Sequence, residues 1–419
     1  MRVGESLIEM DSAALKRILT ETEPDFSCGI VPELSVSDID ETAIEAFKKL
    51  WSQKSGKKEY LDYASDKLLR AAGLMFDKGL TYASLILCGK KEKIDEFLAG
   101  SEIILEWRQD PASVTYDFRK TWREPFFKVY DDIWKTINNR NLRIPLQEGL
   151  FQREIYAFNE KAVREALLNA VAHRDYTIGD RSIFIKASPK EFNIESPGGF
   201  PPGITLENIL VRTSWRNRCI AETLEKAGLV ERSGQGMDDI FGNTIKEGKG
   251  LPDLSASDSS SVVLKIPARV KDKNFILFIE KVQNEKGMIF SFEEILELEK
   301  IRDQQLVSTP EFKRRFLKLG IIEKIGRTSG ARYILSHKYY AYEKRTGVYT
   351  RLSGISRDKQ KELIIKHLEK NKKGYHKDFQ DIFTELKPMD ISNLLQELKN
   401  AEKIVHKGSS KSGFWEIAK

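Results

Sequence analysis

The sequence predicts a multidomain protein of the α/β and α+β classes, and two observations carry that prediction. Between residues 61 and 268, apolar runs of strand length such as SIFIKAS and EFNIES alternate with amphipathic stretches of helical period. Beyond residue 271, a pattern of three helices followed by a hairpin occurs twice. A chain of 419 residues has room for roughly two to four domains, each with its own core.

Changes in composition and pattern predict five segments. They are an N-terminal remnant or helical extension (1–60), an α/β subdomain (61–150), a second α/β domain (151–268) and two copies of the repeat (271–340 and 356–418). The stretch ARVKDK is the expected boundary before the first copy. Within the α/β subdomain, the apolar run YASLILCG (82–89) predicts a strand, SEIILEW a second strand, and EPFFKVYDDIWKTINN a helix.

Cysteine usage and hydropathy exclude several classes of protein. The only cysteines are Cys28, Cys88 and Cys219, and they form no CxxC pair, so neither a disulfide framework nor a zinc site is expected. The N-terminus has acids where a signal peptide is apolar. No apolar stretch approaches the roughly 18 residues of a membrane span. These features predict a cytoplasmic protein without membrane contact.

The charge is unevenly distributed along the chain. From Lys271 to the end, 31 Lys and Arg face 21 Asp and Glu, whereas the preceding residues are mildly acidic. A basic segment attached to a near-neutral body indicates a polyanion partner for that segment. A lysine-rich solvated surface is the alternative.

The helical pattern REALLNAVAHRDY, from Arg164 to Tyr176, carries a row of polar residues. Glu165, Asn169 and His173 are four residues apart, so they share one flank of a helix. A carboxylate can orient or deprotonate a water, and an amide oxygen is a hard ligand for Mg²⁺. The alternative is a solvated helix face, because Glu and Asn commonly occupy one.

Two glycine-containing loops follow this helix. ESPGGFPPG holds Gly198 and Gly199 and comes after two predicted strands, where glycine lets a backbone approach a base or phosphate closely. SGQG holds Gly234 and Gly236 and immediately precedes a predicted helix, whose N-terminus can hold phosphates. Each loop alone is a weak signal, but the helix and both loops in this order indicate a nucleotide site.

These motifs resemble the GHKL ATPase superfamily, in which a Glu-x-x-x-Asn helix precedes an Asp-x-Gly-x-Gly loop and a second glycine box. The closer resemblance is to a subfamily of bacterial and archaeal transcriptional regulators named after the C-terminus of the RecG helicase. REALLNAVAHRDY, ESPGGFPPGIT, SWRNRCIAETLEKAGLVERSGQGMDDI and VVLKIP are similar to its successive motifs, and the likeness covers roughly residues 61–268. Only MRVGES resembles the closing strand of the family's usual N-terminal Schlafen- or AlbA-like domain, so most of that domain is expected to be missing.

The resemblance implies a GHKL-like α/β sandwich over residues 151–268 that binds ATP with Mg²⁺. Glu165 would be the water-activating base, Asn169 the Mg²⁺ ligand and Glu195 the acid that reads adenine. The nucleotide loops would contain Gly198, Gly199, Gly234 and Gly236. His173 would border the nucleotide and hold the helix end or the following loop by a hydrogen bond.

Three departures from the family's pattern leave ATP hydrolysis open. Glu195 replaces an Asp and is one methylene longer. Pro197 replaces the first loop glycine, which removes an amide donor and fixes φ. Arg218 stands where the subfamily usually has proline. The resemblance therefore implies nucleotide binding, with at most a weak ATPase activity expected.

The two C-terminal repeats predict winged helices. FLKLGIIEKIGRTSGARYIL (316–335) and LLQELKNAEKIVHKGSSKSGFWEI (394–417) each combine a helix, a short strand, a polar turn and an aromatic strand, with two helical patterns before them. In the first copy, STPEFKRRFLKLG begins a helix whose basic side chains suit the phosphates and base edges of double-stranded DNA. The predicted DNA contacts are Lys313, Arg314, Arg315 and Lys318 on this helix, Arg327 and Arg332 in its wing, and Lys407 and Lys411 in the second wing. The first copy is expected to read DNA and the second to support it or to dimerise; protein–protein modules are the alternative.

Together these patterns predict a transcriptional regulator in which ATP controls tandem winged helices, with ATP-driven closure altering homo-oligomerisation. The rival interpretation is a non-enzymatic DNA- or protein-binding scaffold with a degenerate nucleotide pocket. A second alternative stays open, because LEKAGLVERSGQG (224–236) is similar in pattern to LKLGIIEKIGRTSG. Residues 211–240 would then form a third winged helix instead of a nucleotide lid, although the preceding ESPGGFPPG favours the lid.

Overall fold

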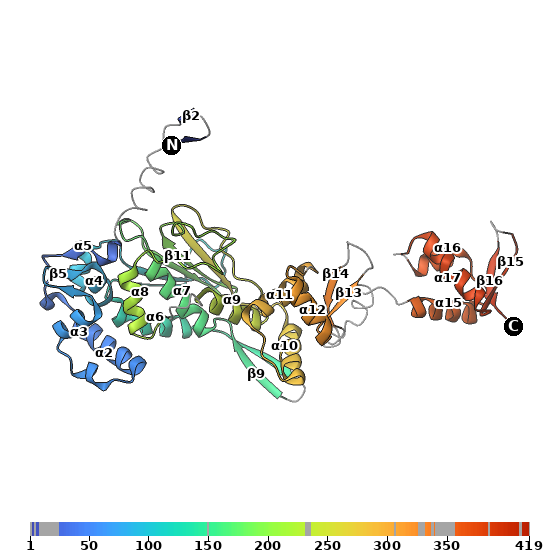
Figure 1. The fold of residues 1–419 in the computed structure, drawn as a ribbon, viewed down its shortest axis with the longest axis horizontal. Helices are drawn as coiled ribbons and strands as arrows, with labels where there is room; N and C mark the ends of the chain where they lie inside the picture. The colour runs from blue at the N-terminus through green and yellow to red at the C-terminus, as the bar shows by residue number, and fades with distance from the viewer. Residues whose placement is uncertain are drawn as a thin grey trace. The chain divides into compact units, whose positions relative to one another are not determined.

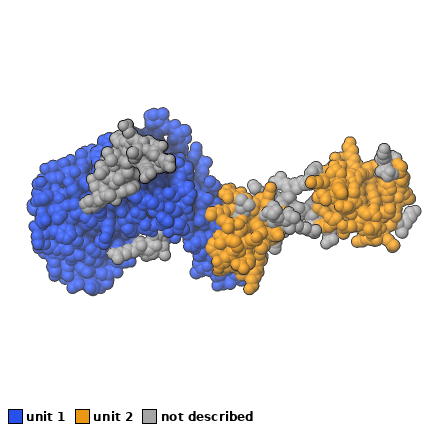
Figure 2. Space-filling model, turned by 45° about the horizontal axis from the view of Figure 1, so that its top comes forward, with its two compact units in different colours: residues 1–299 blue, residues 300–419 orange. Residues whose placement is uncertain are grey.

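The computed structural model describes residues 2–3, 6–7, 25–148, 151–230, 236–305, 307–325, 332–336, 339, 357–383, 386–409 and 413–418. The chain divides into two compact units, 1–299 and 300–419, which Figure 2 shows in different colours. None of the described helices is long and apolar enough to cross a membrane.

The first unit is built around a mixed five-stranded sheet with the order β12-β11-β10-β6-β7. Its strands are β6 (Ile103–Trp107), β7 (Phe118–Trp122), β10 (Ile183–Ala187), β11 (Glu191–Pro197) and β12 (Ser261–Pro267). β6 and β10 pair in parallel, and the other neighbours pair antiparallel. The hairpin predicted from SIFIKAS and EFNIES is therefore confirmed, as is the strand at VVLKIP.

Helix α7 (Glu160–His173) packs on β11 and on α9 (Gly236–Lys246), and it also contacts α6 (Phe126–Asn138) and α8 (Arg218–Lys226) (Figure 1). Its N-cap is Asn159, whose side-chain oxygen accepts a hydrogen bond of 3.1 Å from a first-turn amide. The buried residues of α7 are Ala162, Val163, Ala166, Leu167, Leu168, Ala170, Val171 and Ala172. Half of them are alanines, so the neighbouring elements come close to the helix backbone.

The N-terminal segment shares a core with the helices that follow it. Helix α2 (Glu41–Ser55) packs on α6, where the rings of Phe47 and Phe127 stack with centroids 4.8 Å apart. The expected boundary at residue 60 falls inside the 3-10 helix η3 (Lys58–Asp62). This part of the expected extension therefore belongs to the same folded body as the α/β subdomain.

The strand predicted at residues 82–89 is wrong, because this run forms α4 (Tyr82–Cys88). The hydroxyl of Thr81 caps the helix by accepting a hydrogen bond of 3.2 Å from the Ser84 amide. Every residue of α4 after the first is buried, so the run has no apolar period that could separate helix from strand. The other elements that precede β6 in the chain are β1 (Arg2–Val3), β2 (Ser6–Leu7), η1 (Phe26–Cys28), β3 (Ile30–Val31), η2 (Val36–Asp38), α3 (Ser65–Ala72), β4 (Met75–Phe76), β5 (Gly79–Thr81) and α5 (Lys91–Phe97).

The elements of the first repeat are α10 (Lys273–Lys286), α11 (Phe292–Gln304), α12 (Pro310–Leu319), β13 (Ile322–Ile325) and β14 (Arg332–Leu335). Their order, three helices and then an antiparallel hairpin, is the order expected from the sequence. The boundary between the two compact units falls within α11.

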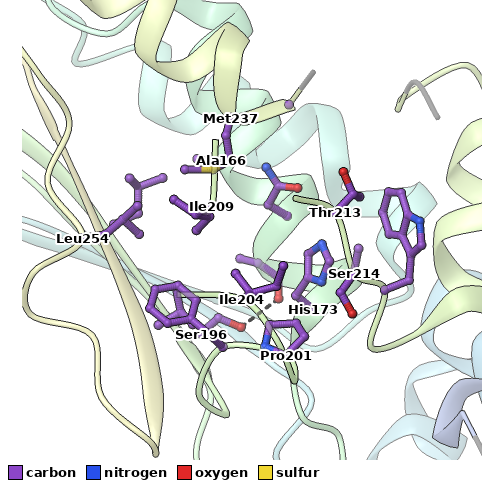
Figure 3. A pocket seen from close by; sticks show the side chains of 18 of the residues that line it. Ala166, His173, Ser196, Pro201, Ile204, Ile209, Thr213, Ser214, Met237 and Leu254 are labelled. Carbon is purple, nitrogen blue, oxygen red and sulfur yellow. Dashed lines mark hydrogen bonds between the residues drawn. The ribbon is translucent and has the colours of Figure 1, made fainter. Parts of the chain in front are cut away.

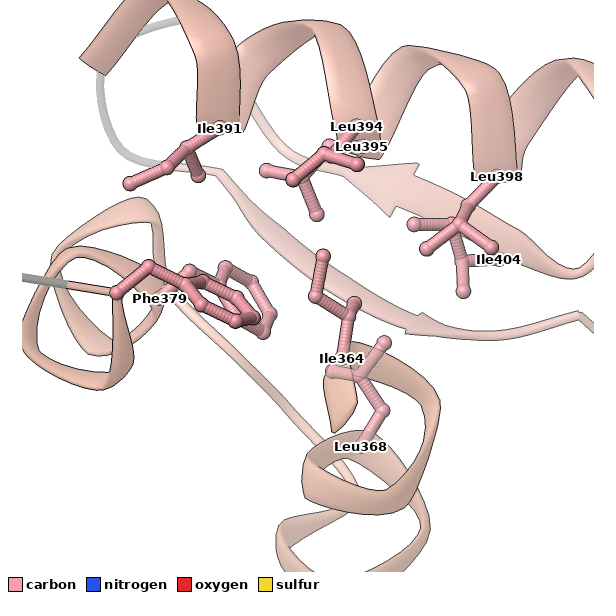
Figure 4. Packing of buried hydrophobic residues seen from close by; sticks show 9 residues of the cluster. Ile364, Leu368, Phe379, Ile391, Leu394, Leu395, Leu398 and Ile404 are labelled. Atoms are coloured by element: carbon pink, nitrogen blue, oxygen red, sulfur yellow. The ribbon is translucent and has the colours of Figure 1, made fainter. Parts of the chain in front are cut away.

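The second repeat has the same order of elements and its own core. They are α15 (Arg357–Asn371), α16 (His376–Ile382), α17 (Pro388–Asn400), β15 (Ile404–Lys407) and β16 (Phe414–Ile417). Side chains from the three helices and β15 meet in one apolar cluster (Figure 4). Its buried members are Ile364, Leu368, Phe379, Phe383, Ile391, Leu394, Leu395, Leu398 and Ile404.

A buried charge network joins α7 and α9 to a hairpin that no sequence pattern indicated, β8 (Arg143–Glu148) and β9 (Phe151–Tyr156). The ammonium of Lys249 is buried, donates to the Tyr156 carbonyl at 2.7 Å and forms an ion pair with Glu247. The other carboxylate oxygen of Glu247 accepts from the Asn159 amide at 2.6 Å. The network thus connects the end of β9, the N-cap of α7 and the residues after α9.

We expect Lys249→Met to destabilise the first unit by about 3 kcal/mol, because loss of one member of a buried ion pair leaves its partner uncompensated. The measurement is the urea dependence of amide hydrogen exchange in α7 and α9. Lys246→Met removes an exposed lysine of α9 and serves as the control. Equal protection in both variants would show that the network does not stabilise the fold.

Candidate functional site

A pocket of about 140 Å³ lies between α7, β11, the loop that follows β11 and the start of α9 (Figure 3). Most of its wall is apolar: Ala166, Ala170, Ile194, Phe200, Pro201, Ile204, Ile209, Met237, Leu254, Val262 and Leu264. Met237 and Ala166 lie toward one end, and Ser196, His173 and Pro201 toward the other (Figure 3). A concave apolar site with a few polar groups is the usual form of a small-molecule pocket.

The polar row predicted on one flank of α7 faces this pocket. Glu165, Asn169 and His173 all line it, and all three are half-buried. The Nδ2 of Asn169 donates to the Oε1 of Glu165 at 3.3 Å. With its amide nitrogen turned toward Glu165, Asn169 keeps its Oδ1 without a hydrogen bond from the described residues.

The start of α9 contacts the carboxylate of Glu165. An ideal Cβ built on Gly236 would overlap the Oε1 of Glu165 and lie 3.3 Å from the Nδ2 of Asn169. A larger residue would therefore displace the carboxylate of Glu165 from the start of α9. The first amides of a helix carry a partial positive charge, so this contact joins the carboxylate to a place that favours anions. Gly234, the other glycine predicted here, lies outside the described residues.

Gly198 also has a position that requires glycine. Its φ is +94°, and an ideal Cβ would overlap the Nη1 of Arg216 and lie 2.6 Å from the Cβ of Asp175. Gly198 lines the pocket, whereas Gly199 does not. The carbonyl of Gly199 instead accepts a hydrogen bond of 2.9 Å from the Nη2 of Arg216.

No individual roles were predicted for residues 214–217 (SWRN), yet this segment binds the C-terminal end of α7 and the loop after β11. Arg216 donates from Nη1 to the His173 carbonyl at 3.3 Å, and Asn217 donates to the Ala172 carbonyl at 3.0 Å. The Trp215 ring stacks on the imidazole of His173, with centroids 5.5 Å apart and an interplanar angle of 10°. The Arg-Asn pair in a loop was the available signal, since both side chains are multiple donors suited to the free carbonyls of a helix end.

The adenine-reading role inferred for Glu195 is not supported by its position. Ile194 and Ser196 line the pocket, and Glu195 between them pairs with the Nη2 of Arg181 at 2.7 Å. Successive side chains of a strand point to opposite faces, so Glu195 cannot share the face of its neighbours. Pro197 pairs with Ser261 in the β11–β12 ladder instead of belonging to the loop.

His173 differs from its expected role as well. Its ring makes no hydrogen bond to the helix end or the following loop among the described residues; the stack on Trp215 and the bond from Arg216 to its carbonyl do the holding. Burial and the nearby Arg216 guanidinium lower the pKa of His173 to about 4. The imidazole is therefore neutral at pH 7.

The oxygen ligands near α9 suit a Mg²⁺ ion that is shared with phosphates. Among the described residues, no three His, Cys, Asp or Glu side chains gather as a metal site. Mg²⁺ usually takes one or two protein oxygens and completes its shell with waters and phosphate oxygens. The Oδ1 of Asn169 fits that requirement, because it borders the pocket without a hydrogen bond from the described part of the chain.

The predicted DNA-contacting residues have different environments. Arg314, Arg315 and Lys318 are exposed on α12, opposite the buried Phe316. Lys313 is half-buried, and its ammonium lies 5.1 Å from the ring centre of Tyr333. Arg332 is exposed at the start of β14, Lys407 is paired with Glu416, and Arg327 and Lys411 lie outside the described residues. The charge of Lys407 is therefore balanced within its own hairpin.

The third winged helix considered for residues 211–240 receives no support from the described residues. Helix α8 ends at Lys226, and residues 227–230 form no strand. The next described element is α9, where a winged helix would have its hairpin.

Two family models match parts of the chain. A family model described as "Putative ATP-dependent DNA helicase recG C-terminal" matches residues 180–265, which include β10, β11, α8 and α9 but not α7. A domain of unknown function (DUF8451) matches residues 16–104. Residues 180–265 are thus similar to an ATPase-like domain of the RecG C-terminal type.

One solved structure is similar over the whole chain. The DIP2311 protein from Corynebacterium diphtheriae has a TM-score of 0.61 and 17% identity, and the similarity covers 100% of this chain and 74% of that one. At this identity the likeness concerns the fold alone. No curated protein matches the sequence significantly.

We expect Gly198→Ala to loosen the loop after β11, because the new methyl group displaces Arg216 from the carbonyls of His173 and Gly199. Hydrogen exchange in residues 198–217 should become faster. Gly203→Ala is the matched control: its φ is +79°, but an ideal Cβ there has no neighbour within 4 Å. It should add only the strain of a left-handed conformation, about 1–2 kcal/mol. Equal effects of both variants would contradict the role given to Arg216.

Proposed function

We propose that the pocket binds ATP with Mg²⁺ and that the protein is a cytoplasmic, DNA-binding transcriptional regulator controlled by this nucleotide. The observation that carries the proposal is the meeting of three features in one pocket: an apolar slot, the Glu165–Asn169 pair of α7 and the glycine at the start of α9. The family match at residues 180–265 supports the same class of ligand.

The two ends of the pocket suit the two ends of a nucleotide. The slot bordered by Ala170, Ile194 and Leu264 would receive the base, since it offers apolar surface on several sides. The phosphates would lie toward Glu165, Asn169 and the first amides of α9, where a helix N-terminus favours anions. Asn169 would hold the Mg²⁺ through Oδ1, and Mg²⁺ would neutralise the phosphate charge beside the carboxylate.

Glu165 is the candidate for water activation in any weak ATPase reaction. The Nδ2 of Asn169 donates to the carboxylate of Glu165 and orients it. The side chain of Asn169 would therefore contact both the Mg²⁺, through Oδ1, and the water-activating carboxylate, through Nδ2. The proximity of Glu165 to the start of α9 brings the carboxylate to the end of the pocket where the terminal phosphate would lie.

We expect Asn169→Ala and Glu165→Ala to affect different steps, the first Mg²⁺-dependent ATP binding and the second ATP hydrolysis. Asn169→Ala should abolish the dependence of ATP affinity on Mg²⁺, because the metal loses its protein ligand. Glu165→Ala should retain ATP binding and lower any hydrolysis by about 10²–10⁴-fold, the usual scale of acid–base assistance. Calorimetric titration with and without Mg²⁺ and phosphate release measure the two effects.

The control for this experiment is Glu160→Ala, which removes an exposed carboxylate of α7 outside the pocket. It should bind and turn over ATP like the wild type. A wild-type protein that does not bind ATP at millimolar concentration would refute nucleotide binding. The scaffold with a degenerate pocket, which the outward position of Glu195 favours, would then be the better proposal.

The DNA surface proposed for the first repeat is the exposed side of α12. Arg314, Arg315 and Lys318 present three cations to solvent, and the opposite side of the helix buries Phe316. A helix of this kind in a winged helix enters the major groove. The second repeat has an independent core and a wing lysine neutralised by Glu416, which suits support or homo-oligomer formation better than base reading.

We expect the full chain to bind double-stranded DNA, with affinity that falls steeply as salt rises, because phosphate contacts release counterions. The double variant Arg314→Ala/Arg315→Ala should weaken binding by roughly 1–3 kcal/mol for each arginine that reads a base. The variant Lys57→Ala/Lys58→Ala removes the same charge from exposed positions of the first unit and should bind nearly as the wild type does. Fluorescence anisotropy at several salt concentrations measures both. Identical losses in the two variants would remove α12 as the DNA surface.

A further inference from the structure

The imidazole of His173 has one hidden and one accessible nitrogen. Its Nδ1 is buried and has no hydrogen-bond partner among the described residues. Its Nε2 also makes no hydrogen bond within the described part of the chain, but it is not buried, and the ring lines the pocket. The accessible nitrogen therefore faces the pocket, which Ser214 and Ile204 also line (Figure 3).

The surroundings decide which nitrogen carries the proton. A neutral imidazole has one N–H and one lone pair, and a buried N–H without an acceptor is costlier than an unpaired lone pair. Burial and the guanidinium of Arg216 lower the pKa of the ring, so the imidazole is neutral and carries a single proton. The proton is accordingly placed on Nε2, so His173 offers a single N–H donor to the pocket.

The position of the donor is fixed from two sides. Trp215 stacks on the ring with an interplanar angle of 10°, and Arg216 holds the carbonyl of the same residue. With a pKa of about 4, the imidazole stays neutral between pH 6 and 8, so its donor is present throughout that range. A held donor of this kind can select a ligand by position as well as by charge.

Ser196 offers the complementary group at the same end of the pocket. Its Oγ–H donates to the Ala170 carbonyl at 2.8 Å, which Figure 3 draws as a dashed line. The proton is thereby committed, and only the lone pairs of Oγ are available to a ligand. His173 and Ser196 together present one donor and one acceptor.

We propose that His173 and Ser196 read the base of the bound nucleotide: the Nε2–H of His173 donates to a ring nitrogen, and the Oγ of Ser196 accepts from the adjacent amino group. This inference rests on the proposed nucleotide binding. Adenine meets the pattern on both of its edges, because the 6-amino group stands between N1 and N7, which are acceptors.

Guanine does not meet the pattern on its N7–O6 edge or on its N1–O6 edge, the two edges that correspond to those of adenine. At its N7 edge it shows two acceptors, N7 and O6, so O6 would face the lone pairs of Ser196. At its other edge N1 carries a hydrogen, which would face the Nε2–H of His173. The pocket should therefore prefer ATP to GTP without any carboxylate at the base.

The test compares ATP with its 1-deaza and 7-deaza analogues, each of which lacks one ring acceptor, on the full-length protein. Calorimetric dissociation constants are measured for the wild type and for His173→Phe, which keeps a ring to stack on Trp215. In the wild type, one of the two analogues should bind about tenfold more weakly than ATP, the usual effect of leaving one buried donor unpaired. The analogue that loses affinity identifies the edge that is read.

His173→Phe should bind ATP about tenfold more weakly than the wild type does and should no longer distinguish ATP from that analogue. Ser196→Ala should keep the distinction, because the ring-nitrogen contact remains. His367→Phe is the control for the same exchange outside the pocket and should match the wild type. It lies in α15, where its ring contacts Phe379.

The outcomes separate this inference from the function on which it rests. If the wild type does not bind ATP, nucleotide binding itself fails. If it binds ATP and both deaza analogues equally well, or if His173→Phe is as sensitive to the analogue as the wild type, nucleotide binding stands and His173 does not read the base. The comparison of analogues on the wild type decides the question even if His173→Phe does not fold.

Discussion

The pocket depends on the hydrogen bonds made to the last backbone carbonyls of α7. The last carbonyls of a helix have no partners within it, and here those of Ala172 and His173 accept hydrogen bonds from Asn217 and Arg216. Arg216 also binds the carbonyl of Gly199. The helix, the glycine loop and the segment that carries Trp215 are thus joined at one point. The backbone of His173 and the loop that carries Gly199 are held there by the same guanidinium.

The opposite end of α7 is held by a different set of charges. Asn159 caps the helix and binds Glu247, which pairs with the buried Lys249. The polar row Glu165–Asn169 therefore lies on a helix that is fixed at both termini. A ligand that enters beside the row meets side chains already in place, which lowers the ordering cost of binding. The apolar Ala166 and Ala170, between the polar positions, let the ligand approach the helix closely.

Helical periodicity predicted the polar row correctly because it depends only on chain-local geometry. Motif matching assigned Glu195 to the pocket, although the alternation of side chains along the strand indicates the opposite face. Phe192 and Ile194 are apolar and buried, so the odd-numbered residues of β11 point away from α7. The apolar run at 82–89 shows no alternation of apolar and polar residues, because a segment that is buried on all sides needs none. Its sequence therefore could not separate helix from strand. The contacts of Arg216 join positions about 40 residues apart, and no local pattern reveals them.

The departures from the resembling family change the reading chemistry more than the pocket itself. A carboxylate at the base would only accept hydrogen bonds, whereas in the proposed site His173 would donate and Ser196 would accept. Glu195 pairs with Arg181, and Pro197 belongs to the β11–β12 ladder, so this face of β11 carries no acid. The polar groups that remain at this end of the pocket are Ser196 and His173. A buried Nδ1 without a hydrogen-bond partner among the described residues is a cost that folding does not require. The ligand proposed for this pocket would use the accessible Nε2 on the other side of the ring.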